Sequence, residues 1–124
     1  MKNIGLIGCG NIAETYFRAQ DYFNNIKFVA CSDKFPEVSK KCADQYNIKS
    51  LTVDEIINDT NVDVILNLTI PQAHFEISKL ALEAGKHVYS EKPMSIKYDE
   101  AHELVNLAKD NNLYIGNAPD TFTD

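Results

Sequence analysis

The chain opens with the stretch MKNIGLIGCGNIA, residues 1–13, in which a short apolar segment runs into the pattern Gly8-x-Gly10-x-x-Ala13. Gly8 permits a tight turn, Gly10 lets the backbone approach a phosphate closely, and the small Ala13 lets a helix pack close to the strand. Free N–H groups at the start of such a helix attract an anion. The stretch therefore predicts a strand, a pyrophosphate-binding turn and a helix, although a glycine pattern alone is a weak signal.

The sequence that follows supplies the context that this pattern requires. Residues 3–7 have the pattern of a strand, and residues 12–23 place apolar side chains near a 3.6-residue period. A second apolar run, Phe28–Ser32, leads to Asp33, 20 positions after the end of the glycine pattern. A carboxylate there can accept hydrogen bonds from the adenosine ribose hydroxyls of a dinucleotide. The alternative for Asp33 is a solvated strand end or a cap for a helix beginning at Pro36.

Composition bounds the class of protein. With 124 residues the chain is long enough for one domain with a buried core. A formal net charge of −6, without a cluster of Lys and Arg, argues against a nucleic-acid partner. Three cysteines without Cys-x-x-Cys spacing favour neither a disulfide framework nor a zinc site. No targeting segment or membrane span is evident, so we expect the protein in a reducing cytoplasm.

Helical and strand patterns alternate along the rest of the chain. Pro36 is placed to open a helix, and residues 47–50 read as a short link. Thr52 and Glu55 form a capping box, which predicts the start of a short second helix. Residues 62–68 are almost continuously apolar, as expected for a strand that helices cover on both faces.

Two longer helices complete the pattern. The first begins near Pro71 and ends at Gly85, where a left-handed C-cap is expected, and a strand at 86–89 follows it. The second carries acidic residues in its first turn and precedes a strand at 113–115. The residues predicted to face the core from the three long helices are Val38, Cys42, Ala43 and Tyr46; Ala73, Ile77, Leu80, Ala81 and Ala84; and Ala101, Leu104, Val105 and Ala108.

This alternation predicts an α/β fold, a single doubly wound parallel sheet of the Rossmann type. About six strands are expected, in the order 3-2-1-4-5-6. Ligands of such sheets bind at the carboxyl ends of the strands.

A further motif, Glu91-Lys92-Pro93, follows the strand at 86–89. At the carboxyl edge of the sheet, Lys92 would reach the nicotinamide end of a dinucleotide, hydrogen-bond a substrate oxygen and relay a proton. Glu91 would hold this lysine or contact the nicotinamide ribose, and Pro93 favours an extended backbone at Lys92. The alternative is a surface ion pair between Glu91 and Lys92.

Together with Pro71-x-x-His74, these motifs resemble the cofactor domain of the Gfo/Idh/MocA family of sugar and cyclitol oxidoreductases over essentially the whole chain. The resemblance implies a nicotinamide cofactor and places His74 near its nicotinamide side; the alternative for His74 is a polar group at a helix terminus. Lys92 is the predicted catalytic residue, no metal ligand is predicted, and His87 and His102 are expected to be structural or solvated. The predicted cofactor-binding residues are Gly8, Gly10, Asn11, Ile12, Asp33, Lys34, Pro71, His74, Glu91 and Lys92.

The choice between the two nicotinamide cofactors depends on neighbouring residues of opposite charge. The carboxylate of Asp33 repels the 2′-phosphate of NADP and favours NAD. Lys34 beside it can partly offset this repulsion, which leaves NADP open. We therefore predict NAD(H) as the cofactor.

Residues 1–117 are expected to form the dinucleotide-binding domain, and residues 118–124 to begin the connection to a substrate domain absent from this sequence. The resemblance implies a parent protein that moves a hydride between nicotinamide and a secondary alcohol of a sugar, sugar derivative or cyclitol, while this chain alone binds cofactor with little or no turnover. A sensor of a dinucleotide or sugar, without catalysis, is one alternative, and a methyltransferase is another. The Glu91-Lys92 pair argues against both. The identity of the substrate and a homo-oligomeric state stay open.

Overall fold

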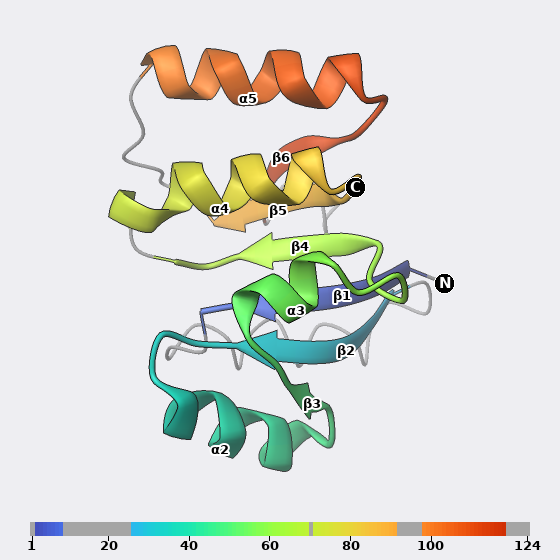
Figure 1. Cartoon of the computed structure of the whole chain (residues 1–124), viewed down its shortest axis with the longest axis vertical. Coiled ribbons are helices and arrows are strands. Elements are labelled where there is room, and N and C mark those ends of the chain that lie inside the picture. The colour runs from blue at the N-terminus through green and yellow to red at the C-terminus, as the bar shows by residue number, and fades with distance from the viewer. Residues whose placement is uncertain (1, 9–25, 70, 92–97, 119–124) are drawn as a thin grey trace.

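A computed structural model describes residues 2–8, 26–69, 71–91 and 98–118 of the chain. Its strands form one six-stranded sheet in the order β3-β2-β1-β4-β5-β6, in which every neighbouring pair is parallel (Figure 1). The strands are β1 (Lys2–Ile7), β2 (Ile26–Ser32), β3 (Lys49–Ser50), β4 (Val64–Asn67), β5 (His87–Glu91) and β6 (Ile115–Ala118). The helices are α2 (Pro36–Tyr46), α3 (Val53–Ile57), α4 (Pro71–Glu83) and α5 (Tyr98–Asp110). The predicted fold class and strand order are confirmed.

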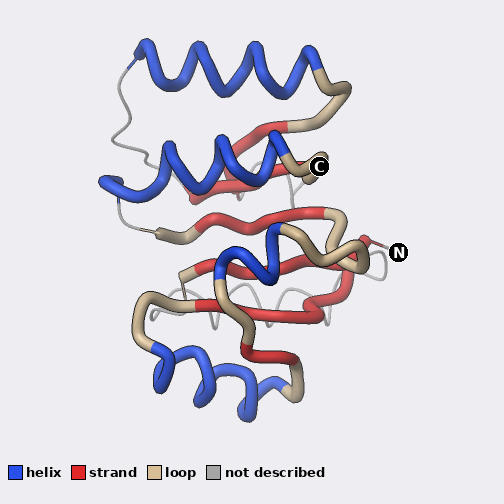
Figure 2. Tube along the Cα trace, in the orientation of Figure 1, coloured by secondary structure: helices blue, strands red, loops and turns tan. Residues whose placement is uncertain are grey.

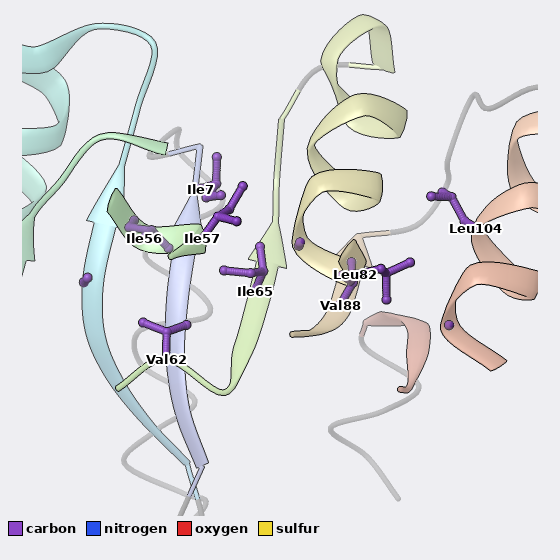
Figure 3. Close-up of a cluster of buried hydrophobic side chains, with 11 residues drawn as sticks. Ile7, Ile56, Ile57, Val62, Ile65, Leu82, Val88 and Leu104 are labelled. Carbon is purple, nitrogen blue, oxygen red and sulfur yellow. The ribbon is translucent and has the colours of Figure 1, made fainter. Parts of the chain in front are cut away.

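Two hydrophobic clusters cover the two faces of the sheet. Side chains alternate between faces along a strand, so Ile4 and Leu6 of β1 pack with α2, whereas Ile7 packs with α3. The second cluster also takes in α4 and α5, and Figure 3 shows Ile7, Leu82, Val88 and Leu104 among its members. The strands lie as one layer among the helices in Figure 2. Helices on both faces bury all four residues of β4, which explains why its sequence is almost entirely apolar.

The expected helix signals take the predicted form. Pro36 is the first residue of α2. The hydroxyl of Thr52 accepts the backbone N–H of Glu55 at 3.1 Å, and a carboxylate oxygen of Glu55 accepts the N–H of Thr52 at 2.9 Å. Gly85, beyond the end of α4, has a φ of 85°, the left-handed conformation that glycine adopts without steric penalty.

The third strand lies where the sequence predicted only a link. Lys49 and Ser50 form β3 at the edge of the sheet, paired with β2. Both are exposed, so no apolar pattern marks them. The last strand also differs from the prediction, because β6 spans Ile115–Ala118 whereas the sequence predicts a strand at 113–115.

The buried faces of the three long helices differ from the predicted apolar stripes. Leu80 and Val105 are 42% and 54% exposed, and Val38 is exposed as well. Three polar side chains, Ser39, His74 and Ser78, are buried instead. Their hydroxyl and imidazole groups have buried hydrogen-bond partners, a feature that hydrophobic periodicity does not detect.

Lys86 is a buried lysine at the edge of the sheet opposite the carboxyl ends of the strands. It is 8% exposed, and its ammonium donates to the carbonyl oxygens of Asp59 at 2.5 Å and Val62 at 2.6 Å. The lysine thus ties the start of β5 to the loop between α3 and β4. A long polar side chain satisfies two carbonyls that would otherwise lose hydrogen bonds on burial.

We expect Lys86→Met to lower the free energy of unfolding by about 1–2 kcal/mol, because the stem still packs while both carbonyls lose their donor. Urea denaturation with an unchanged m-value measures the loss. Lys79→Met is the matched control, since the 3.0 Å ion pair of Lys79 with Glu103 is solvent-exposed and worth only about 0–1 kcal/mol. Equal stability of Lys86→Met and the wild-type chain would contradict the role of this lysine.

Within the part of the chain that the structure describes, no helix combines the length and apolar character needed to cross a bilayer.

Candidate functional site

The predicted site residues come together because the strands are parallel. Gly8 follows β1, Asp33 follows β2, Pro71 begins the helix after β4, and Glu91 is the last residue of β5. The carboxyl ends of parallel strands meet at one edge of the sheet, so these positions share that edge. Strand order reverses between β1 and β4, and a doubly wound sheet binds its ligand in the crevice at such a point.

Gly8 occupies a position that no other residue fits without strain. Its φ is 102°, and a Cβ built on it would lie 2.8 Å from the carbonyl oxygen of Leu68. The amide of Gly8 donates to the carbonyl oxygen of Ser32 at 2.8 Å, while the amide of Leu68 donates to that of Ile7 at 2.8 Å. Gly8 therefore contributes space rather than a free donor. A tight turn at a position that excludes a side chain is what the dinucleotide motif requires of its first glycine, so Gly8 fits a dinucleotide.

Asp33 follows the end of β2 but is not the helix cap that the sequence left open as an alternative. Its Oδ2 accepts the backbone N–H of Phe35 at 3.0 Å, which shapes the turn into α2. The N-cap of that helix is Phe35, which makes no side-chain capping bond, so Asp33 shapes the turn without capping the helix. Asp33 remains partly exposed, and the exposed Lys34 has its Nζ 5.9 Å from the centroid of the Phe35 ring.

Asn67, at the end of β4, is a buried polar residue with a complete set of hydrogen bonds. Its Nδ2 donates to the carbonyl oxygen of His74 at 3.1 Å and to Oγ of Ser78 at 2.9 Å. Its Oδ1 accepts the backbone N–H of Thr69 at 3.1 Å and the hydroxyl of Thr69 at 2.5 Å. An amide has two N–H groups and two acceptor positions, so the side chain is saturated and its orientation is fixed.

His74 lies in the first turn of α4 and is only 3% exposed. Its Nε2 lies 2.6 Å from Oγ of Ser90, which is also buried. Burial lowers the pKa of His74 to about 4, so the imidazole is neutral at neutral pH. Nδ1 is buried without a partner among the residues that the structure describes. Since buried N–H groups without a partner are rare, we assign the proton to Nε2 as the donor to Ser90.

We call Asn67, His74, Ser78 and Ser90 the edge cluster. Of these residues the sequence predicted only His74, and as a cofactor contact. Asn67 could have been noticed as the one uncharged polar residue in the apolar run 62–68, while Ser78 and Ser90 carry no comparable signal. Gly10, Asn11, Ile12 and Lys92 lie outside the described residues, as does the helix expected over 12–23.

No group of three or more His, Cys, Asp or Glu side chains placed to hold a metal ion occurs in ranges 2–8, 26–69, 71–91 and 98–118. His87 accepts the backbone N–H of Tyr114 at 2.9 Å through Nδ1, which ties β5 to the segment before β6.

Comparison with known proteins matches this arrangement. A sequence model for Gfo/Idh/MocA proteins, described as an oxidoreductase family with an NAD-binding Rossmann fold, matches residues 2–117. The chain belongs to the Gfo/Idh/MocA family. Membership makes the α/β sheet an NAD(P)-binding Rossmann domain and agrees with the position of Gly8 at the switch point.

Proteins that are similar to this chain differ in what their names say they act on. An inositol 2-dehydrogenase/D-chiro-inositol 3-dehydrogenase of Lactiplantibacillus plantarum is 28% identical over 113 residues, covering 88% of this chain and 32% of the relative. A biliverdin reductase of Synechocystis, crystallised with biliverdin and NADP+, has a TM-score of 0.85 and 27% identity, with coverage of 93% and 37%. An NAD-binding oxidoreductase of Klebsiella pneumoniae has a TM-score of 0.82 and 28% identity, with coverage of 94% and 34%. The chain thus spans about a third of the length of these relatives.

Proposed function

We propose that residues 1–117 are the dinucleotide-binding domain of an oxidoreductase that transfers a hydride between nicotinamide and a secondary alcohol of a sugar, sugar derivative or cyclitol. The observation that carries the proposal is Gly8, at the point where the strand order reverses and where a side chain would meet the backbone of Leu68. The family of the chain and its inositol dehydrogenase relative support the reaction class. The similar biliverdin reductase of Synechocystis is named for a different kind of substrate, so structural likeness alone does not select the alcohol.

The cofactor would lie along the carboxyl edge of the sheet. Its pyrophosphate belongs at Gly8, Gly10, Asn11 and Ile12, and its adenosine ribose at Asp33. Asp33 favours NAD over NADP because a second anion beside its carboxylate is repelled. Lys34, next to Asp33, can attract that anion. The residues that would lie at the nicotinamide end are Pro71, His74, Glu91 and Lys92.

Lys92 is the proposed catalytic residue. The bound cofactor supplies or accepts the hydride. The lysine ammonium hydrogen-bonds the substrate oxygen, stabilises the negative charge that develops there and passes a proton to or from it. Glu91, its neighbour at the end of β5, holds the lysine or contacts the nicotinamide ribose.

Substitution of Asp33 tests the cofactor assignment. We expect wild-type chain to bind NADH more tightly than NADPH in calorimetry, and Asp33→Asn to shift the ratio of the two affinities toward NADPH by about tenfold. The amide removes the charge that repels the 2′-phosphate and weakens the hydrogen bonds to the ribose. Asp44→Asn is the matched control, because it removes the same charge from the exposed face of α2 and should leave the ratio unchanged.

Three results would contradict this proposal at different levels. A wild-type chain that binds neither NADH nor NADPH would contradict dinucleotide binding itself. Tighter binding of NADPH would contradict only the preference for NAD. A protein that binds a sugar but shows no oxidoreductase activity toward it would favour the non-catalytic sensor instead.

A cytoplasmic location forms part of the same proposal. It is supported by the sequence, in which three cysteines without Cys-x-x-Cys spacing favour no disulfide framework.

A further inference from the structure

The edge cluster consists of polar side chains in a buried position. Apolar side chains could pack there without giving up hydrogen bonds to water. Burying a hydroxyl, an amide and an imidazole is unfavourable unless each finds a partner. Asn67 and Ser78 are 1% and 0% exposed, and His74 and Ser90 are equally well covered. Such a network is weak evidence for stability but fixes a single arrangement of the elements that carry it.

The network joins three elements at one point. Asn67 is the last residue of β4 and pairs in register with Ser90 of β5. The amide of Asn67 holds the first turns of α4 through the carbonyl of His74 and the hydroxyl of Ser78. The imidazole of His74 then reaches from α4 to the hydroxyl of Ser90.

Ser90 immediately precedes Glu91, and Lys92 follows. A hydrogen bond to the side chain of Ser90 fixes the position from which the next two residues start. His74 is suited to this because its low pKa keeps it neutral, so it donates through Nε2 without placing a charge in the core.

We propose that His74 and Ser90 form a positioning pair that aligns Glu91 and Lys92 with the nicotinamide end of the cofactor, His74 acting through Ser90 rather than by touching the cofactor. This proposal rests on the proposed function, since it presupposes a dinucleotide at the carboxyl edge. It assigns no such role to Asn67 or Ser78, which fix the end of β4 and the start of α4.

The experiment compares binding of NADH with binding of ADP-ribose, which lacks the nicotinamide. We expect His74→Phe and Ser90→Ala each to weaken NADH binding by about tenfold, while ADP-ribose binding changes less than about twofold. The double variant should be no weaker than either single variant, because both remove the same hydrogen bond. His74→Gln, which can present an amide N–H in place of Nε2–H, should recover most of the affinity for NADH.

Ser78→Ala is the matched control, since it deletes another buried hydroxyl of the edge cluster but leaves the bond between His74 and Ser90 in place. This variant should lower the free energy of unfolding but leave the ratio of the affinities for NADH and ADP-ribose unchanged.

Three outcomes overturn the inference. Equal weakening of both ligands by His74→Phe and Ser90→Ala would show that the pair acts on the fold alone. Unchanged NADH affinity in both variants would show that the pair aligns nothing at the nicotinamide end. Failure of the wild-type chain to bind either ligand would overturn the proposed function, and this inference with it, whereas the first two outcomes leave that function intact.

Discussion

Gly8→Ala will lower the free energy of unfolding by about 3 kcal/mol and weaken NADH binding by at least about 100-fold. A φ of 102° is unfavourable for alanine, and the added methyl lies 2.8 Å from the backbone oxygen of Leu68. A backbone atom cannot rotate away as a side chain does, so the end of β1 must move from β4 to relieve the contact. That movement displaces the beginning of the proposed pyrophosphate cradle.

Gly85→Ala separates the cost of a positive φ from the cost of the steric contact with Leu68. Gly85 also has a positive φ, 85°, but nothing lies within 4 Å of its added Cβ. We therefore expect a loss of only about 1 kcal/mol for this variant, with NADH affinity unchanged. Urea denaturation and calorimetry of the two variants provide the comparison. Equal effects of both substitutions on stability and binding would refute the importance of the contact with Leu68.

Mild acid will destabilise the protein through the buried imidazole of His74. The pKa of His74 is lowered from 6.5 to about 4 by burial, so between these values the unfolded chain binds a proton that the folded chain does not. Stability therefore falls as the pH falls through 6.5 toward 4. From about pH 7.5 to about pH 5, this histidine should remove about 2 kcal/mol of the free energy of unfolding.

The contribution of His74 is isolated by His74→Gln, which has the same carboxylates and lacks the imidazole. Urea denaturation at the two pH values should show a loss about 2 kcal/mol smaller for this variant than for wild type. His87→Gln should remove a smaller part of the slope, because burial and then Lys2 lower the pKa of this partly exposed histidine in the same direction. An unchanged slope in His74→Gln would rule out a buried neutral imidazole.

The sheet order was predictable because a few residues constrain it strongly. Gly8 demands a strand before it, and the apolar run of β4 demands cover on both faces. β3 gave no such signal, since two exposed residues at an edge are held only by pairing with β2. Its position depends on the contacts of α2 and β2 around it, which are set by the assembled fold.

For the site, sequence patterns predicted residues that lie at the carboxyl edge of the sheet, but not the buried polar residues that pack behind them. Gly8 and Asp33 each follow a strand, and their spacing along the sequence is typical of a dinucleotide-binding motif. Ser90 and Ser78 matter through partners 16 and 11 positions away, His74 and Asn67. Hydrophobic periodicity does not distinguish a buried serine with hydrogen-bond partners from an exposed serine. For the same reason the predicted buried face of α4 includes Leu80, which is exposed, and misses Ser78, which is buried.

The bonds of Gly8 to β2 and of Leu68 to β1 continue the ladder of the sheet beyond its last strand residues. The floor on which the proposed cofactor would rest, Gly8 and Leu68, is therefore preorganised, because both residues are already held by hydrogen bonds of the sheet. Binding loses little affinity to ordering them. Variation among relatives in cofactor affinity should then arise at the residues that reach over this floor, and little at the floor itself.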